Sequence, residues 1–219
     1  MSSPVSRSVV RPRLRGVLHQ YAFVVSLVAG PLLWLTAPVG RPRLAASLFA
    51  GSLSALFGVS ALYHRITWSV RARRWVGRLD HAMIYLLIAG SVAPLGLLVL
   101  SGTPAVVMLS VVWGGAAAGI GLHTVWLDAP KWLSVLAYVA LSWTGALAIP
   151  QMVAQLGWGA GTLFVLEGLF YSAGALAYIL RRPDPVPGIF GYHEVFHALV
   201  IAGAATHYAV LAFFVLPSA

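Results

Sequence analysis

Three histidines and one aspartate are the residues of this chain whose types and spacing suggest chemistry. His193 and His197 are four residues apart. On a helix they would share one face, about 6 Å apart along the axis. Two neutral imidazoles at this spacing are a common half of a zinc site, and a third histidine from another helix would complete the set. His64 could supply that nitrogen and Asp80 a nearby carboxylate, if the fold brings them together.

The remaining composition narrows the ligands that a metal could use. The chain has no cysteine, so any metal must be held by His, Asp, Glu or water. Ser60 precedes His64 by four residues and would share its face. It could bond a metal-held water or a substrate carbonyl, or simply bond back to its own helical turn. Asp80 could hold that water or orient a ligand histidine, or it could cap a helix or pair with Arg78.

The segment from His193 to His197 also reads His-Glu-x-x-His. In soluble metalloproteases the glutamate of this motif is the general base, which would be Glu194 here. No acidic residue follows Glu194, so a carboxylate ligand would have to come from earlier in the chain. His207 lies about 15 Å further along the same helix than His197, which excludes it from the same metal. We expect His207 to be a buried, hydrogen-bonded histidine.

Four other ionisable residues lie in or beside apolar segments, and the sequence assigns them no chemistry. Glu167 falls in the middle of an apolar run, where an unpaired charge is costly. It is expected to be protonated, paired or part of a polar cavity, and the sequence does not choose between these. His19, His81 and His123 are expected to be structural.

The elements that must position these residues are membrane-spanning helices. Of the 219 residues, 60% are hydrophobic and only 9% are charged. A water-soluble domain of this size needs about a quarter charged residues. Spans of about 20 apolar residues predict an all-α, seven-helix bundle in a multi-pass protein of the cell membrane. The predicted spans are 18–38, 44–65, 79–101, 104–124, 132–150, 159–180 and 192–216.

The distribution of positive charge predicts the orientation of this bundle. With the N-terminus inside, the inner segments hold twelve of the fourteen Lys and Arg residues, and only Arg41 and Arg43 lie outside. This bias is typical of cytoplasmic loops. The net charge of +9 is therefore interpreted as a membrane signal and not as a nucleic-acid surface. The expected organisation is a basic cytoplasmic arm (1–17), a seven-helix domain (18–219) and a C-terminus outside.

This topology carries a consequence for the candidate site. The second span would end at His64, the third would begin near Asp80, and the seventh would begin near His193. Three separate helices would then bring these residues to one depth near the cytoplasmic face. The topology rests on the distribution of Lys and Arg alone, so the convergence of these residues independently supports a site.

Three motifs of the chain resemble those of the hemolysin III proteins, within the wider progestin and adipoQ receptor family. Ser60-Ala-Leu-Tyr-His64 is similar to the family's motif in its second helix. Arg78-Leu-Asp80-His81 is similar to the motif of its third helix. Phe190-Gly-Tyr-His193-Glu-Val-Phe-His197 resembles the block of its seventh helix. The resemblance covers nearly the whole chain.

The resemblance implies a fold, a cofactor and roles for the motif residues. It implies seven helices with the N-terminus inside, and a zinc ion held by His64, His193 and His197. Asp80 would hold the zinc-bound water, with Ser60 close by. It also groups the chain with alkaline ceramidases among membrane hydrolases. The chain departs from the family pattern at Glu167, where a small residue is expected, and in its arginine-rich arm.

Three functions remain open on the sequence. The first is a zinc-dependent hydrolase of lipid amides or esters, with Asp80 as general base and Ser60 assisting at the carbonyl oxygen. The second is a receptor-like sensor or pore-forming protein in which zinc is structural. The third is an intramembrane metalloprotease that uses Glu194. A membrane lipid is the expected substrate or ligand.

Overall fold

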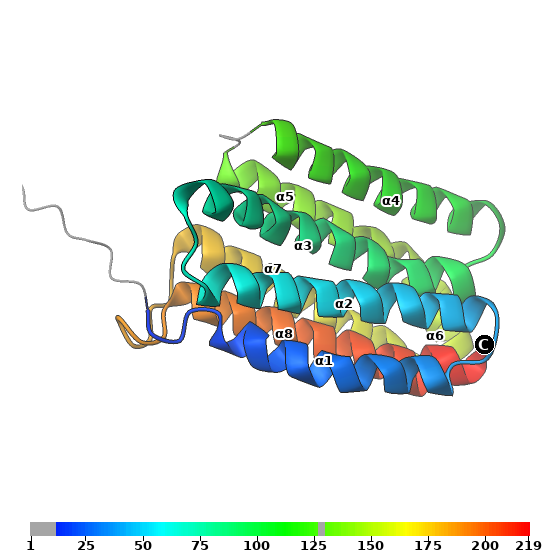
Figure 1. Cartoon of the computed structure of the whole chain (residues 1–219). Coiled ribbons are helices and arrows are strands. Elements are labelled where there is room, and N and C mark those ends of the chain that lie inside the picture. The colour runs from blue at the N-terminus through cyan, green and yellow to red at the C-terminus, as the bar shows by residue number, and fades with distance from the viewer. Residues whose placement is uncertain (1–11, 127–129) are drawn as a thin grey trace, which may run out of the picture.

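The structure, a computed structural model, describes residues 12–126 and 130–219, and its long elements are all helices (Figure 1). Of the predicted arm, Arg7 and Arg11 lie outside the described residues. Two short 3-10 helices and a π-helical turn complete the set: Trp143–Ala148, Leu216–Ser218 and Leu211–Val215. The α-helices are α1 (Val17–Thr36), α2 (Arg41–Arg65), α3 (Val70–Leu98), α4 (Gly102–Val125), α5 (Lys131–Ser142), α6 (Ile149–Leu156), α7 (Trp158–Leu180) and α8 (Tyr192–Val210).

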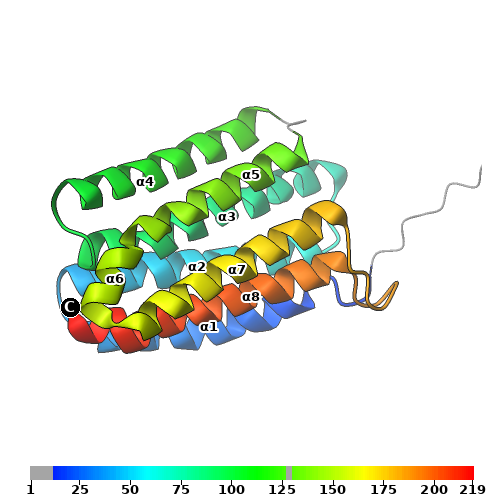
Figure 2. The ribbon, with the colours of Figure 1, turned by 180° about the vertical axis from the view of Figure 1, so that it is seen from behind.

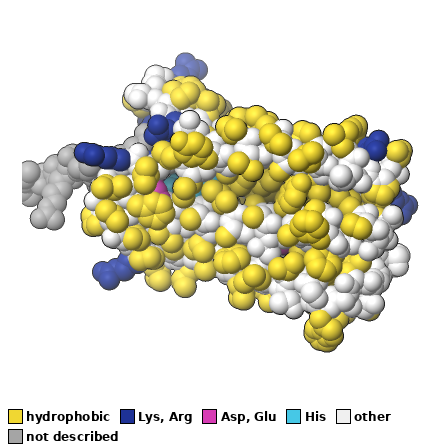
Figure 3. Space-filling model, turned by 90° about the horizontal axis from the view of Figure 1, so that it is seen from below, with side chains coloured by type: hydrophobic (Ala, Val, Ile, Leu, Met, Phe, Trp, Pro, Cys, Tyr) yellow, Lys and Arg dark blue, Asp and Glu magenta, His cyan; other side chains and the backbone are white. Residues whose placement is uncertain are grey.

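Seven helical segments are long and apolar enough to cross a membrane. Figure 3 shows apolar side chains spread over the long face of the bundle, with Lys and Arg side chains gathered at its two ends. The prediction of an all-α bundle with seven spans is confirmed, and the protein is a multi-pass membrane protein. The spans are Val17–Thr36, Arg41–Arg65, Val70–Leu98, Gly102–Val125, Trp132–Leu156, Trp158–Leu180 and Tyr192–Ser218.

The third helix begins earlier than the sequence predicted. The basic stretch between spans two and three was expected to separate them as far as Arg78, but α3 starts at Val70. The hydroxyl of Ser69 caps this start by accepting from the Ala72 amide at 3.3 Å. Arg78 then lies over the Trp75 ring, 4.3 Å from its centroid. Hydropathy marks only the apolar part of a helix, so it missed these two basic turns.

The fifth span is longer than predicted. Its apolar run was expected to end at Pro150, but the helix continues through the 3-10 turn Trp143–Ala148 into α6. Pro150 falls in the first turn of α6, where its missing N–H costs no hydrogen bond. The span ends at Gly157, whose φ of 85° suits a residue without a side chain.

The two ends of the bundle carry different segments (Figures 1 and 2). The start of α1, the α2–α3 connection and the α7–α8 connection lie together at one end, here called the arm end. The C-terminus and the α1–α2 and α3–α4 connections lie at the other. Backbone hydrogen bonds from Arg13 to Gly188 (3.0 Å) and from Leu14 to Ile189 (3.1 Å) fasten the arm to the α7–α8 loop.

Close packing of α2 against α3 places Ser60 and His64 near Asp80. Helix α2 lies between α1 and α3, and α7 lies along α8. Gly90 of α3 faces Ser52 and the Leu48 carbonyl of α2, and a Cβ at this position would overlap both. This close approach brings the arm-end halves of α2 and α3 to the distance at which short polar side chains meet.

Candidate metal centre

The three histidines that were predicted as metal ligands meet at the arm end. His64 lies in the last turn of α2, and His193 and His197 lie in the first two turns of α8. One ring nitrogen from each lies within 4.8 Å of the other two. The Nε2 atoms of His64 and His193 are 3.2 Å apart. His64 and His197 are buried, and His193 is half-buried.

Local sequence explains why α8 presents two of these histidines. The α7–α8 loop contains Pro183, Pro185 and Pro187, which do not continue a helix. The helix starts after Gly191, whose amide donates to the Glu194 carboxylate at 2.9 Å. His193 and His197 then follow one turn apart, with ring centroids 4.5 Å apart.

Asp80 of α3 stands beside this group. Its Oδ2 lies 3.7 Å from His64 Nε2. Because α3 begins ten residues earlier, at Val70, Asp80 is not its N-cap. Ser60, one turn before His64 in α2, is buried. The structure therefore brings all five residues singled out for the site to the arm end of the bundle.

His19 of α1 belongs to the same neighbourhood, although the sequence interpretation treated it as structural. Its Nδ1 lies 2.8 Å from the Ser60 hydroxyl oxygen. Its ring stacks on that of His197, with centroids 3.8 Å apart and planes inclined by 6°. Nothing in the local sequence signals these contacts, because His19 stands far from both partners along the chain.

Both carboxylate oxygens of Glu194 have partners outside the histidine cluster. Its Oε1 pairs with Arg15 Nε at 2.5 Å, and its Oε2 accepts from the Gly191 amide. The side chain is 1% exposed. Glu194 therefore closes the start of α8 and anchors the arm.

Glu167 and His207 form a second polar group deeper in the bundle. His207 Nδ1 lies 2.7 Å from Glu167 Oε2, and both side chains are buried. The ring of Phe49 packs against His207, with centroids 4.8 Å apart. The expectation of a hydrogen-bonded His207 is confirmed. Of the alternatives for Glu167, pairing is observed.

His81 and His123 have local partners. His81 Nδ1 lies 2.7 Å from the Gly77 carbonyl oxygen, within the same helix. His123 Nε2 lies 3.2 Å from the Tyr138 hydroxyl. The two histidine rings also stack on each other, with centroids 5.6 Å apart. These contacts agree with the structural role expected for both.

A cavity of about 1360 Å³ connects these groups. At the arm end it is lined by the histidine cluster, Asp80, Ser60 and His19. Further in, most of its lining is apolar, with Ser91, Tyr171 and Glu167 among the polar side chains, so Glu167 also belongs to a cavity wall. A polar mouth with an apolar interior suits a molecule that has a polar group and a hydrocarbon chain. The apolar lining includes Leu56, Ile84, Leu87, Ile88, Val92, Phe164 and Val200.

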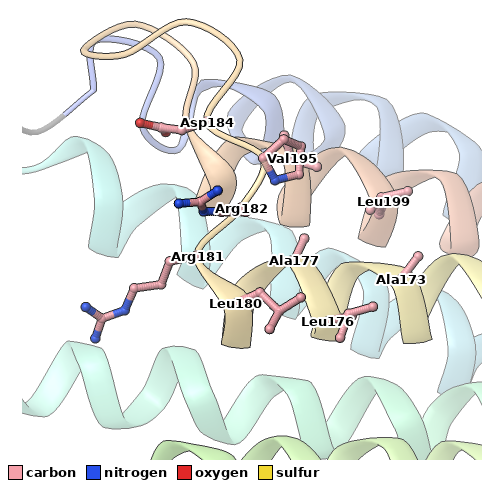
Figure 4. A pocket seen from close by; sticks show the side chains of 10 residues that line it. Ala173, Leu176, Ala177, Leu180, Arg181, Arg182, Asp184, Val195 and Leu199 are labelled. Carbon is pink, nitrogen blue, oxygen red and sulfur yellow. The ribbon is translucent and has the colours of Figure 1, made fainter.

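A second hollow lies between α7 and α8 and contains none of the candidate site residues. Figure 4 shows Ala173, Ala177 and Leu199 along it, with Arg181 and Arg182 at its arm end. Its volume is about 860 Å³. Small side chains such as these let neighbouring membrane helices pack closely, which is a structural role. The chemistry of the molecule is therefore concentrated in the larger cavity.

The histidine cluster fits a zinc ion. Zinc bonds imidazole nitrogen at about 2.0–2.1 Å, so two nitrogens on a tetrahedral zinc lie about 3.3 Å apart. The 3.2 Å between His64 Nε2 and His193 Nε2 is close to that spacing. His197 Nδ1 is buried and has no hydrogen-bond partner among the described residues. Three imidazoles with a carboxylate nearby form a donor set that zinc favours.

Fold and site together define a seven-helix membrane protein with a buried histidine cluster at one end. The comparisons with known proteins agree with this class. The chain belongs to the haemolysin-III related family, which it matches over residues 7–208. No solved structure gives a significant match.

Curated relatives come from bacteria, plants and animals. The chain is 29% identical over 168 residues to the hemolysin-3 homolog of Bacillus subtilis (strain 168), covering 77% of this chain and 76% of the relative. It is 32% identical over 185 residues to the heptahelical transmembrane protein ADIPOR2 of Oryza sativa subsp. japonica, covering 77% and 81%. It is 34% identical over 188 residues to the adiponectin receptor protein of Drosophila melanogaster, covering 74% and 40%.

Proposed function

We propose that the protein is a zinc-dependent hydrolase of lipid amide or ester bonds. His64, His193 and His197 would hold the zinc, and Asp80 and Ser60 would act on the substrate. The single observation that carries this proposal is the convergence of three imidazole nitrogens within 4.8 Å, beside a carboxylate, in a cavity with an apolar interior. An apolar cavity that begins at such a site suits a lipid better than a water-soluble substrate.

The chain's own residues suffice for the proton movements of hydrolysis. Zinc held by three imidazoles supplies a Lewis acid and an activated water near neutral pH. Asp80 would accept the proton of the water whose oxygen attacks the carbonyl carbon. The Ser60 hydroxyl donates to the carbonyl oxygen as negative charge develops there. The bond to the leaving nitrogen or oxygen then breaks, and Asp80 returns its proton to the leaving group.

The experiment is release of fatty acid from a panel of membrane lipid amides and esters by purified protein in nanodiscs. Asp80→Asn should keep zinc and fold but lose about a hundred- to ten-thousandfold in rate, because an amide accepts no proton at neutral pH. Glu194→Gln is the matched control, since Glu194 faces Arg15 and not the cluster. Zinc-loaded wild type that releases nothing from the panel would refute the hydrolase.

The second candidate is a non-catalytic sensor or pore-forming protein in which zinc is structural. One observation favours it: a single ion on His64 and His197 would join α2 to α8, which are far apart in the sequence. The names of two relatives, a hemolysin-3 homolog and an adiponectin receptor protein, also favour this function. Under this function Asp80→Asn would change thermal stability and nothing else.

The metalloprotease alternative has less support. A general base must reach the water that it activates. Glu194 is instead held by Arg15 and by the Gly191 amide.

The proposal places the arm end in the cytoplasm, since most of the positive charge lies there. Single cysteines can test this, because the chain has none of its own. An impermeant thiol reagent added from outside should label cysteines at Ser101 and Ser218, which are exposed at the opposite end. It should reach a cysteine at Arg73 only after permeabilisation. Labelling at Arg73 in intact cells would reverse the topology.

A further inference from the structure

His19 makes two contacts with the proposed site that a histidine packed only for burial would not need. Its side chain is buried, with 3% of the residue exposed. One ring nitrogen reaches the Ser60 hydroxyl, and one ring face covers His197. The Phe57 ring lies 5.1 Å away, inclined by 55°. The imidazole is thus held between a residue of α2 and a ligand histidine of α8.

We propose that His19 is a positioning residue of the metal centre, which rests on the proposed zinc site. Its stacked ring fixes the plane of the His197 imidazole, and its Nδ1 fixes the rotamer of the Ser60 hydroxyl. His19 itself stands outside the group of three nitrogens that would bind the ion. It acts through its neighbours, as the partners of metal-bound histidines commonly do.

The start of α1 is built to bring His19 to this place. Gly16 precedes the helix with a φ of 80°, a conformation that favours glycine. A Cβ at Gly16 would overlap the side chain of His64. Only a residue without a side chain lets the first turn of α1 approach the ligand so closely. His19 follows one turn later, level with Ser60.

Histidine is the residue that satisfies both contacts at once. A leucine would fill the space with neither a flat ring nor a polar atom. A phenylalanine would keep the flat ring on His197 and lose the bond to Ser60. A glutamine would keep a polar group near Ser60 and lose the ring. These three substitutions therefore separate the two contacts.

Cobalt(II) is the probe for the contact with His197, because its visible absorption reports the geometry of its ligands. Wild-type protein stripped of metal is titrated with cobalt(II), beside His19→Leu, His19→Phe and His19→Gln. We expect His19→Leu and His19→Gln to bind about 10- to 100-fold more weakly, with a shifted band. His19→Phe should keep the wild-type affinity and band. His123→Leu is the control, since His123 contacts Tyr138 and His81 instead.

The outcomes separate this inference from the proposed zinc site. Wild type that takes up no cobalt would overturn the site and the role of His19 with it. Wild-type binding with unchanged affinity and spectrum in all three variants would overturn the role of His19 alone. Equal weakening in His123→Leu would also overturn it, because the effect would then be general. Melting of the metal-free variants shows which of them fold, and His19→Phe keeps the test valid if His19→Leu does not.

The contact with Ser60 is tested by combining substitutions in the fatty-acid release assay. His19→Phe and Ser60→Ala should each lower kcat by a similar factor, with KM little changed. The double variant should be no slower than the slower single variant, because both changes remove the same oriented hydroxyl. Multiplying effects would show that His19 does not act through Ser60.

Discussion

Two polar groups share one long helix of this protein, and they differ in what their histidines contact. His197 and His207 lie on α8, about 15 Å apart along the axis. At the deeper position, His207 bonds to Glu167 at 2.7 Å. At the arm end, His197 is surrounded by other imidazoles, and the nearest carboxylate of that group, Asp80, is 3.7 Å from His64.

Under the proposed function, this difference explains why one group of histidines holds a metal and the other holds the fold. At the deeper position the carboxylate of Glu167 and Nδ1 of His207 satisfy each other, while His207 Nε2 has no hydrogen-bond partner among the described residues. At the arm end, one ring nitrogen from each of three imidazoles lies within 4.8 Å of the other two. A cation completes such a group. The neighbours of a buried histidine, more than its burial, decide whether it holds the fold or a metal.

The largest expected effect is on zinc content. It should follow the removal of imidazoles at the arm end and not the removal of His207. The His193→Ala/His197→Ala variant should lose its zinc completely, because one remaining imidazole does not hold the ion. The measurement is metal content of purified protein, with about one zinc per chain expected in wild type. Full occupancy in the double variant would refute the site.

Breaking the deeper pair should lower stability without removing the metal. Glu167→Leu leaves Nδ1 of the buried His207 without its hydrogen-bond partner, which typically costs about 1–3 kcal/mol of unfolding free energy. Replacing both members, in Glu167→Leu/His207→Leu, should restore most of that loss, because no polar group then remains unpaired. Thermal melting in detergent compares the three proteins.

Zinc content distinguishes the two regions in the same experiment. Both Glu167 variants that fold should keep wild-type zinc. Loss of zinc in the double variant would mean that the two polar groups are not separate and that the wrong histidines were assigned to the metal.

The smallest effect is expected from Glu194, which stands between the ligands in sequence but not in space. Glu194→Gln keeps an oxygen for the Gly191 amide and loses the charge that pairs with Arg15. The cost should be about 1.5 kcal/mol, the scale of one charged hydrogen bond. Metal content and rate should stay near wild type. A collapse of the rate with normal zinc would revive the protease function.

The spans and the histidine cluster could both be predicted from the sequence, because both follow from where the apolar runs begin and end. Apolar runs of about 20 residues identify membrane helices. The alternation of more basic and less basic loops then predicts which end of each helix faces the cytoplasm. Once seven helices are ordered, their ends are known, and His64 and His193 must lie at the same end. The one-turn spacing of His193 and His197 needs no tertiary information at all.

The contacts that sequence reasoning missed all join helices distant in the chain. The stacking of His19 on His197 and the pairing of Arg15 with Glu194 depend on the rotation of α1 against α2 and α8. Hydropathy contains no information about rotation in lipid, since every face of a span can be apolar. For the same reason the pairing of Glu167 with His207 stayed one of three alternatives.

The sequence by itself determined the class of the protein: a seven-helix membrane bundle with three histidines and an aspartate near one end. It could do so because helix length, hydropathy and four-residue spacing are local quantities. Only the tertiary structure decided which polar groups meet, because close approaches such as Gly16 against His64 set how each helix is turned. The rotation of the helices brings His64, His193 and His197 together at the arm end. It also places Glu167 at hydrogen-bond distance from His207.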